Sequence, residues 1–252
     1  MRLGVNIDHI ATLRNARGSI YPSPLDAAKI VESSGAHQIT IHLREDRRHI
    51  MDNDVIEIIK NAKIDVNLEI GVTDEMIDIA LEHKPKFVCL VPENRKERTT
   101  ESGLSLDSIN LQNTINRFHK QNIEVSLFID PSIDNIKKSK KLNANFIELH
   151  TGNYSNSSSD KIVKELDLIK ECAKFSKEIG IICNAGHGLN FDNVENIAKI
   201  YEINELNIGH SIICEAVFIG LEIWRLFAVT NFIFLSTDVI NNCSIVSPLS
   251  SI

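Results

Sequence analysis

The stretch "LGVNIDHIATLRNARG", residues 3–18, separates the two folds that this chain could adopt. It opens with a short apolar run, which is typical of a buried β-strand, and continues into a longer segment. An open, doubly wound sheet that binds a dinucleotide usually carries a glycine-rich turn, G-x-G-x-x-G, directly after its first strand. Residues 3–18 contain no such turn, and the open sheet is therefore the second choice of fold.

The same alternation continues outward along the chain. Short runs rich in Ile, Val, Leu and Phe recur, and between them lie segments with apolar residues three and four positions apart. Alternating strands and helices imply parallel pairing, because each helix carries the chain back to the starting edge. Eight such units in 252 residues predict an α/β fold, the (β/α)8 or TIM barrel. The predicted strands cover residues 3–8, 38–43, 65–71, 87–92, 124–130, 146–152, 180–186 and 205–210.

The predicted helices carry boundary signals of their own. Ser23 is a suitable N-cap before Pro24, and Gly35 closes the same segment. Thr73 opens another helical segment in the same way.

Bulk composition excludes several classes of protein. With 43% hydrophobic and 24% charged residues, the chain resembles an ordinary globular protein. A formal net charge of −7 argues against a nucleic-acid-binding surface, which needs a basic field. The five cysteines are scattered without a C-x-x-C pair, so we predict neither a disulfide framework nor a zinc knuckle, and a reducing, cytoplasmic compartment. The first ten residues do not resemble a signal peptide, and we expect no membrane segment.

Polar residues gather where the predicted strands end. In a barrel the loops after the strands converge at one rim, and chemistry takes place there. Strands buried in a barrel are expected to be nearly all apolar, because an unpaired polar group there costs several kcal/mol. A carboxylate inside such a strand, as at Glu69 and Glu148, therefore indicates a site. The polar residues at strand ends are Asp8, His9, His42, Arg44, Glu69, Glu93, Asp130, Glu148, His150, Asn184, His187 and His210.

"TIHLREDRRHI", residues 40–50, illustrates the choice between a structural and a functional reading. Taken alone, a charge run after a strand is most simply a solvated turn. The polar ends of the other strands favour the second interpretation, in which His42, Arg44 and His49 form part of a site for an anionic ligand. Asp130 and His150 are interpreted as structural residues with satisfied hydrogen bonds.

Two glycine-containing loops indicate phosphate binding. "NAGHGLN", residues 184–190, offers free backbone N–H groups, and "NIGHSI", residues 207–212, runs into a helix N-terminus, which favours negative charge. Loops after the seventh and eighth strands are the usual phosphate site of a TIM barrel. Arg17 and Arg44 can hold a second anionic group through forked hydrogen bonds.

A metal site is the competing interpretation of the charge run. His42 and His49 flank Glu45 and Asp46, a donor set that suits zinc or iron. Three arginines in the same run repel a cation, and the chain contains no H-E-x-x-H motif. We therefore predict no metal.

Taken together, these motifs resemble the pyridoxine 5'-phosphate synthase family, in order from about residue 3 to Gly220. The resemblance implies a (β/α)8 barrel with additional short helices, assembled as a homo-octamer, without metal or organic cofactor. It also implies phosphorylated small-molecule substrates: 1-deoxy-D-xylulose 5-phosphate and 3-amino-2-oxopropyl phosphate condense to pyridoxine 5'-phosphate, inorganic phosphate and water. The motifs are "GVNIDHIATLRNARG", "TIHLREDRRHI", "NLEIGVT", "LVPENRKERTTESGL", "VSLFID", "FIELHTG", "NAGHGLN" and "ELNIGH".

The resemblance also implies roles for individual residues. His42 and Glu69 would accept protons, His187 would donate one, and Glu148 would stabilise charge in a transition state. Arg17 is expected to reach the site from a neighbouring subunit. The residues expected to hold the aminoketone phosphate are Asn6, Arg17, Gly188, Gly209 and His210. Those expected to hold the deoxyxylulose phosphate are Asp8, His9, Arg44, His49 and Thr99.

Condensation, loss of water and ring closure all move protons, so groups that titrate near neutrality are needed. Desolvation in an apolar strand would raise the pKa of a carboxyl group, and we therefore expect Glu69 to give as well as take protons.

The end of the chain departs from the family pattern. Residues 226–252 are apolar and then rich in Ser and Asn, and too interrupted for a membrane span. We therefore expect a single barrel domain over residues 1–225 and an atypical tail over 226–252. Two alternative functions stay open: another barrel lyase or isomerase acting on sugar phosphates, with or without metal, and an inactive phosphate-binding protein.

Overall fold

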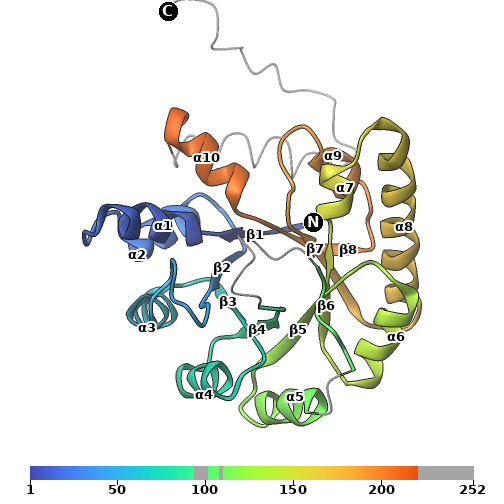
Figure 1. Ribbon diagram of the computed structural model, residues 1–252, viewed down its shortest axis with the longest axis horizontal. Helices are drawn as coiled ribbons and strands as arrows, with labels where there is room; N and C mark the ends of the chain where they lie inside the picture. The colour runs from blue at the N-terminus through green and yellow to red at the C-terminus, as the bar shows by residue number, and fades with distance from the viewer. Residues whose placement is uncertain (94–101, 108–109, 221–252) are drawn as a thin grey trace, which may run out of the picture.

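The computed structural model describes residues 1–93, 102–107 and 110–220, and in it eight parallel strands close into a barrel (Figure 1). Neighbouring strands follow one another in chain order, and β8 pairs with β1 to close the ring. The (β/α)8 fold is thus confirmed, and every predicted strand is present to within two residues at each end. The strands are β1 Arg2–Asn6, β2 Gln38–His42, β3 Asp65–Ile70, β4 Phe87–Leu90, β5 Glu124–Ile129, β6 Phe146–His150, β7 Ile182–Gly186 and β8 Ile203–Ile208.

Helices surround the strands as an outer ring (Figure 1). The predicted cap at Ser23 is confirmed: its Oγ accepts a hydrogen bond from the Asp26 N–H at 3.3 Å, and Pro24 is the first helical residue. Thr73 takes the N-cap position of α4 without a capping side-chain bond. The helices are α1 Asp8–Arg17, α2 Pro24–Ser33, α3 Asp52–Asn61, α4 Asp74–His83, α5 Leu111–His119, α6 Ile133–Lys141, α7 Gly152–Asn156, α8 Ser159–Glu178, α9 Val194–Ala198 and α10 His210–Ile219.

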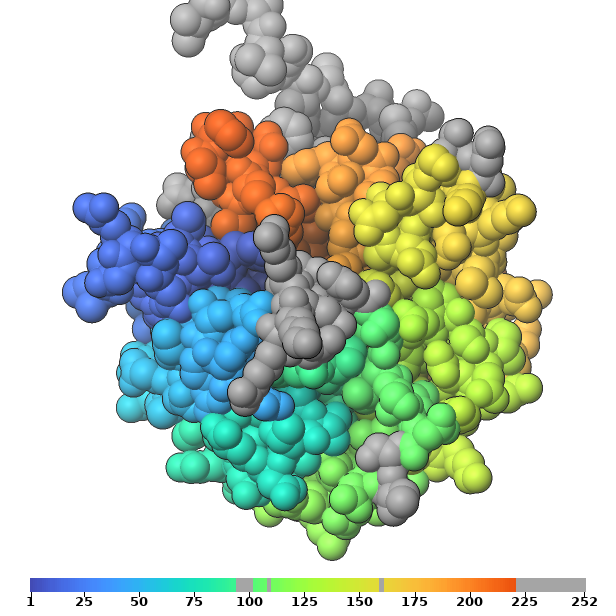
Figure 2. Space-filling view, viewed as in Figure 1, coloured from blue at the N-terminus to red at the C-terminus, as the bar shows by residue number. Residues whose placement is uncertain are grey.

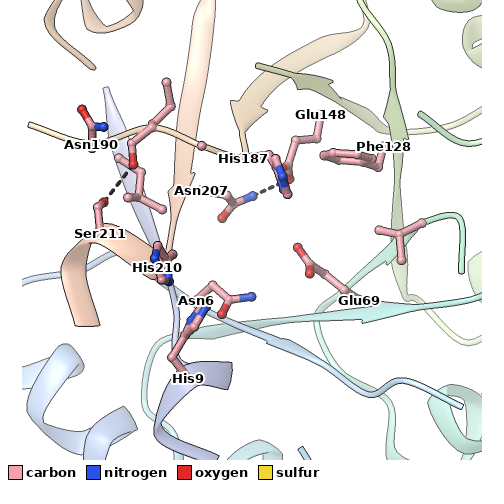
Figure 3. A pocket seen from close by; sticks show the side chains of 15 residues that line it. Asn6, His9, Glu69, Phe128, Glu148, His187, Asn190, Asn207, His210 and Ser211 are labelled. Carbon is pink, nitrogen blue, oxygen red and sulfur yellow. Dashed lines mark hydrogen bonds between the residues drawn. The ribbon is translucent and has the colours of Figure 1, made fainter. Parts of the chain in front are cut away.

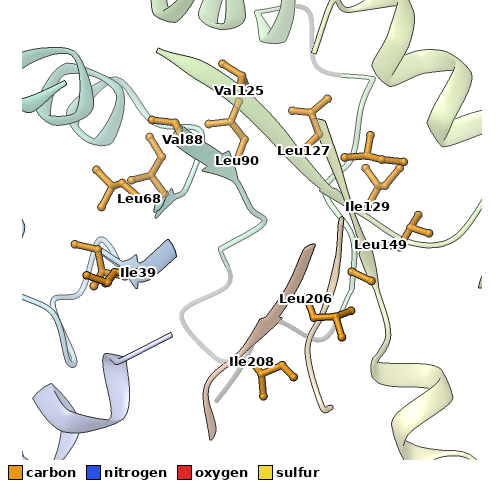
Figure 4. Close-up of a cluster of buried hydrophobic side chains, with 14 of the residues drawn as sticks. Ile39, Leu68, Val88, Leu90, Val125, Leu127, Ile129, Leu149, Leu206 and Ile208 are labelled. Atoms are coloured by element: carbon orange, nitrogen blue, oxygen red, sulfur yellow. The ribbon is translucent and has the colours of Figure 1, made fainter. Parts of the chain in front are cut away.

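The main hydrophobic core lies between the barrel wall and these helices (Figure 4). Successive side chains of a strand point to opposite faces of the sheet, so one alternate set faces outward. Ile39, Leu68, Leu127 and Leu149 belong to this set and are fully buried. Each such side chain contributes about 1.5–3 kcal/mol on burial, and this layer holds the strand ends in place.

The inside of the barrel is polar, and the expectation of nearly all-apolar strands is wrong. Gln38, Asn67, Ser126 and Glu205 are buried there and line a second cavity at the N-terminal ends of the strands. Partners compensate the burial of Gln38 and Glu205: Gln38 Nε2 donates to Glu205 Oε1 at 2.7 Å, and Arg2 Nε donates to Glu205 Oε2 at 3.0 Å. Paired in this way, polar groups cost far less inside a protein than unpaired ones.

Two predictions concern the rest of the chain. The boundary between a barrel of residues 1–225 and a tail of residues 226–252 lies outside the described residues. No helix within the described ranges is long and apolar enough to cross a membrane.

Candidate active site

A cavity of about 350 Å³ opens at the C-terminal ends of the strands (Figure 3). Parallel strands all present their C-terminal ends to this rim, so side chains distant in sequence meet there. Its walls combine carboxylates, imidazoles and amides with a few apolar side chains. The lining residues are Asn6, His9, Glu69, Val91, Phe128, Glu148, His187, Gly188, Leu189, Asn190, Asn207, Ile208, Gly209, His210 and Ser211.

Two carboxylates, Glu69 on β3 and Glu148 on β6, face the cavity. Burial raises the pKa of Glu69 well above its usual value, and the nearby charges of Glu148 and Asp8 raise it further. Burial also raises the pKa of Glu148 to about 7, against a hydrogen bond from Asn207 that lowers it. Asn207 Nδ2 donates this bond to Glu148 Oε2 at 2.6 Å. The pKa of Glu148 thus lies near neutral pH, where a group can take and return a proton, and that of Glu69 is shifted in the same direction.

His42 stands beside Glu69 because strands β2 and β3 pair in a register that places these residues opposite each other. The His42 Nδ1 atom lies 3.9 Å from Glu69 Oε2. On the other side of the ring, His42 Nε2 lies 3.2 Å from Glu93 Oε1. An imidazole held between two carboxylates is well placed for proton transfer.

The loop after β7 and the start of α10 form the part of the rim that suits an anion. His187 and Gly188 both have left-handed backbone, with φ of 80° and 77°. A Cβ on Gly188 would lie 2.8 Å from Ser155 Cβ, and one on Gly209 would lie 2.8 Å from Asn6 Cβ, so both positions require glycine. The free N–H groups at the N-terminus of α10 favour a bound phosphate.

Burial and, to a smaller extent, the neighbouring His150 together lower the pKa of His187 to about 4. The imidazole is therefore neutral at pH 7. A left-handed φ at a non-glycine residue is strained, and such strain is concentrated at functional sites.

A second group of polar side chains continues the site beyond Glu69. Asp8 is buried, and its Oδ1 accepts the His42 N–H at 2.8 Å while its Oδ2 accepts from Asn6 Nδ2 at 2.8 Å. Burial lowers the pKa of His49, whose ring centroid lies 5.9 Å from that of His42. Arg44 is also buried, 3.6 Å from Asp46 Oδ1 through its Nε. An arginine beside two histidines gives this region donors for an anionic group.

The same region offers donor atoms to a metal ion. One ligand atom each of Asp8, His42 and His49 lies within 4.8 Å of the others. Both carboxylate oxygens of Asp8 already accept hydrogen bonds, which weakens it as a metal ligand.

Most of the predicted site residues meet in this part of the molecule. Glu69, Glu148 and His187 line the cavity together with Asn6, His9, Gly188, Gly209 and His210. His42, Asp8, Arg44 and His49 lie next to it. Two predicted residues are not brought in: Arg17 is exposed at the end of α1, and Thr99 lies outside the described residues.

Four further residues line the cavity and are not predicted from the sequence: Asn207, Phe128, Asn190 and Ser211. Asn207 could have been recognised, because it lies two positions after Glu205 and therefore on the same face of strand β8. Asn190 and Ser211 are ordinary loop or helix-start residues, for which local sequence offers no such signal.

Asp130 and His150 bond to each other: His150 Nδ1 lies 3.1 Å from Asp130 Oδ1. The buried His150 ring also packs 4.9 Å from the His187 ring, centroid to centroid. The contact keeps the His187 ring in place at the rim.

Comparison with solved structures supports the fold alone. Thiamine phosphate pyrophosphorylase from Pyrococcus furiosus superposes with a TM-score of 0.60 at 13% identity, over 94% of this chain and 97% of that one.

Sequence comparison is more specific. Pyridoxine 5'-phosphate synthase of Zymomonas mobilis is 52% identical over 226 residues, 88% of each chain. The protein of the same name from Pelagibacter ubique is 51% identical over 225 residues, covering 88% of this chain and 94% of the relative. The sequence profile described as "Pyridoxal phosphate biosynthesis protein PdxJ" matches residues 3–225. This chain therefore belongs to the PdxJ family of pyridoxal phosphate biosynthesis proteins.

Proposed function

We propose that this protein acts in vitamin B6 biosynthesis as a pyridoxine 5'-phosphate synthase. It condenses 1-deoxy-D-xylulose 5-phosphate with 3-amino-2-oxopropyl phosphate, and the products are pyridoxine 5'-phosphate, inorganic phosphate and water. The observation that carries the proposal is the meeting of Glu69, Glu148 and His187 in one cavity whose rim suits a phosphate. Family membership supports the same reaction.

The proposed proton transfers follow from the surroundings of each group. His42 and Glu69 accept protons during imine formation and ring closure, and the raised pKa of Glu69 lets it return them. Glu148 stabilises positive charge that develops on the substrate nitrogen or carbon. His187 donates a proton: a phosphate dianion bound beside Gly188 raises the pKa of this imidazole, so the substrate itself charges the donor.

Two phosphate subsites complete the proposal. Asn6, Gly188, Gly209 and His210 hold the aminoketone phosphate, and Arg17 of a neighbouring subunit closes over it. A separate group of residues holds the deoxyxylulose phosphate. Its members are Asp8, His9, Arg44, His49 and Thr99.

The proposed assembly is a homo-octamer in the cytoplasm. Helices α1 and α10 lie side by side on one face of the molecule (Figure 2). Four large apolar side chains are exposed on or just after these helices: Leu13, Ile20, Val217 and Phe218. Apolar exposure of this kind supports a subunit interface. The described cysteines are free thiols, in keeping with a reducing compartment.

The test is an assay of pyridoxine 5'-phosphate formation from the two purified substrates. Turnover that survives exhaustive chelation is the expected result. Loss of turnover on chelation, with return on adding a divalent metal, would favour a metal-assisted lyase or isomerase, for which the Asp8, His42 and His49 cluster is the supporting observation. Phosphate binding without any turnover would identify an inactive homologue.

A further inference from the structure

Glu93 is a buried carboxylate at the catalytic rim, directly after β4, and only 5% of its side chain is exposed. Its two oxygens join the ends of three strands. Oε1 accepts the Gly71 N–H at 3.1 Å and also lies 3.2 Å from His42 Nε2. Oε2 accepts the Glu45 N–H at 3.0 Å. The carboxylate therefore binds one imidazole nitrogen and two backbone amides from separate loops.

These contacts keep Glu93 ionised. Burial raises the pKa of the carboxyl group, but the hydrogen bonds from His42 and from the Glu45 amide, together with the charge of Arg44, outweigh burial and bring the pKa below its usual value. An ionised carboxylate only accepts hydrogen bonds. The proton of a neutral His42 must then sit on Nε2, the nitrogen that faces Glu93.

We propose that Glu93 is a positioning residue that holds His42 in its Nε2–H tautomer and leaves Nδ1 as the basic nitrogen. Nδ1 is also the atom that lies 3.9 Å from Glu69 Oε2, on the side of the reacting groups. A carboxylate behind an imidazole orients the ring and fixes which of its nitrogens carries the proton. The inference deepens the proposed function, because it names which nitrogen of His42 takes the proton.

Gly71 makes the close approach of Glu93 possible. A Cβ at this position would lie 3.2 Å from the Glu93 Cγ, Cδ and Oε1 atoms, so any larger residue pushes the carboxylate away by a few tenths of an ångström. Gly71 does not have a left-handed φ, and alanine therefore fits its backbone. Gly71→Ala thus moves the carboxylate without removing its charge.

The experiment is ¹⁵N NMR of histidine-labelled protein, in which the two ring nitrogens report the tautomer directly. His42→Asn assigns the His42 signals among the nine histidines. We expect the Nε2–H tautomer in the unmodified chain. Glu93→Ala removes both acceptor oxygens, so the preference for the Nε2–H tautomer should be lost.

Steady-state kinetics provide the second readout. We expect kcat of Glu93→Ala to fall about 100-fold to 10,000-fold with a much smaller change in KM, as for a base that has lost the carboxylate that orients it. Gly71→Ala should also lower kcat, by a smaller factor, and is the second variant if Glu93→Ala does not fold. Glu195→Gln on the exposed face of α9 is the matched control and should change neither readout.

An Nδ1–H tautomer in the unmodified chain, or a tautomer that Glu93→Ala leaves unchanged, would overturn the inference. The NMR result does not depend on turnover. An Nε2–H tautomer whose preference is lost in Glu93→Ala, in a chain without synthase activity, would refute the proposed function and leave the inference about Glu93 standing.

Discussion

Glu69 and Glu148 face the cavity from strands whose outward side chains are apolar, and the protein keeps them there at a cost in stability. Burial is the largest cause of the raised pKa of both groups. The charged form of each is therefore less favourable in the folded chain than in the unfolded chain. Catalytic groups commonly carry such a cost, because the same desolvation that destabilises the charge makes proton transfer near pH 7 efficient.

Glu69→Gln tests the contribution of Glu69 to catalysis. The amide keeps the size of the side chain but cannot shuttle a proton, so we expect kcat to fall about 100-fold to 10,000-fold. Fold and substrate binding should be retained, as measured by circular dichroism and by isothermal titration with each phosphorylated substrate. Near-normal turnover would remove Glu69 from the mechanism.

Glu148→Gln tests how much stability the burial of Glu148 costs. The folded-state pKa of Glu148 is raised from 4.5 to about 7, so the folded chain holds a proton that the unfolded chain releases between these values. Stability therefore falls as pH rises through this window. Glutamine does not titrate. The free energy of unfolding of Glu148→Gln, minus that of the unmodified chain, should therefore increase by about 3 kcal/mol between about pH 4 and pH 8.

Urea unfolding at several pH values measures this difference. The exposed Glu195→Gln variant should show a flat difference across the same range. A flat difference for Glu148→Gln as well would mean that Glu148 is not desolvated in the folded protein.

At the scale of elements, helix α1 holds the loop between β2 and α3 in place. Arg14 donates two hydrogen bonds to the Asp54 carboxylate, at 2.6 Å and 2.8 Å, and a third to the His49 carbonyl at 3.2 Å. Asp54 Oδ2 also accepts the Met51 N–H at the start of α3. The position of His49 at the site therefore depends on the Arg14–Asp54 ion pair, which lies outside the cavity.

Arg14→Ala tests this dependence. The substitution leaves the mostly buried Asp54 without its partner, and we expect the free energy of unfolding to fall by about 3 kcal/mol. KM for 1-deoxy-D-xylulose 5-phosphate should rise because the loop that carries His49 loses its anchor. Lys199→Ala breaks an exposed pair with Glu195 and should change stability by about 0.5 kcal/mol or less. Equal effects of the two variants would contradict the anchoring role.

At the scale of the whole molecule, a single chain does not bring all the residues of the proposed site together. Arg17 is exposed at the end of α1, away from the Gly188 and Gly209 phosphate region of the same chain. A shared site in a homo-oligomer would explain why an arginine that we propose to bind phosphate is exposed in the single chain.

Subunit mixing tests the shared site. Arg17→Ala and Glu69→Gln should each be inactive alone, one for lack of the arginine and the other for lack of the proton shuttle. After the two are unfolded and refolded together, about one quarter of the sites should combine an intact Glu69 with an Arg17 from the neighbour. Activity in the mixture, measured against each variant refolded alone, is the expected outcome. A mixture as inactive as its components would place Arg17 in its own subunit's site or outside the mechanism.

Local sequence determined the order of strands and helices. Each element is indicated by the spacing of its apolar residues and by its capping residues, and both patterns extend over only a few neighbouring positions. Local sequence also placed Glu69, Glu148 and His187 at one rim, since all C-terminal ends of parallel strands meet there. Tertiary structure alone decided that the barrel interior is polar, and that Glu93 stands behind His42. Both depend on closure of the ring and on strand register, which bring together residues fifty or more positions apart, and no local pattern records which distant partner a buried polar group will find.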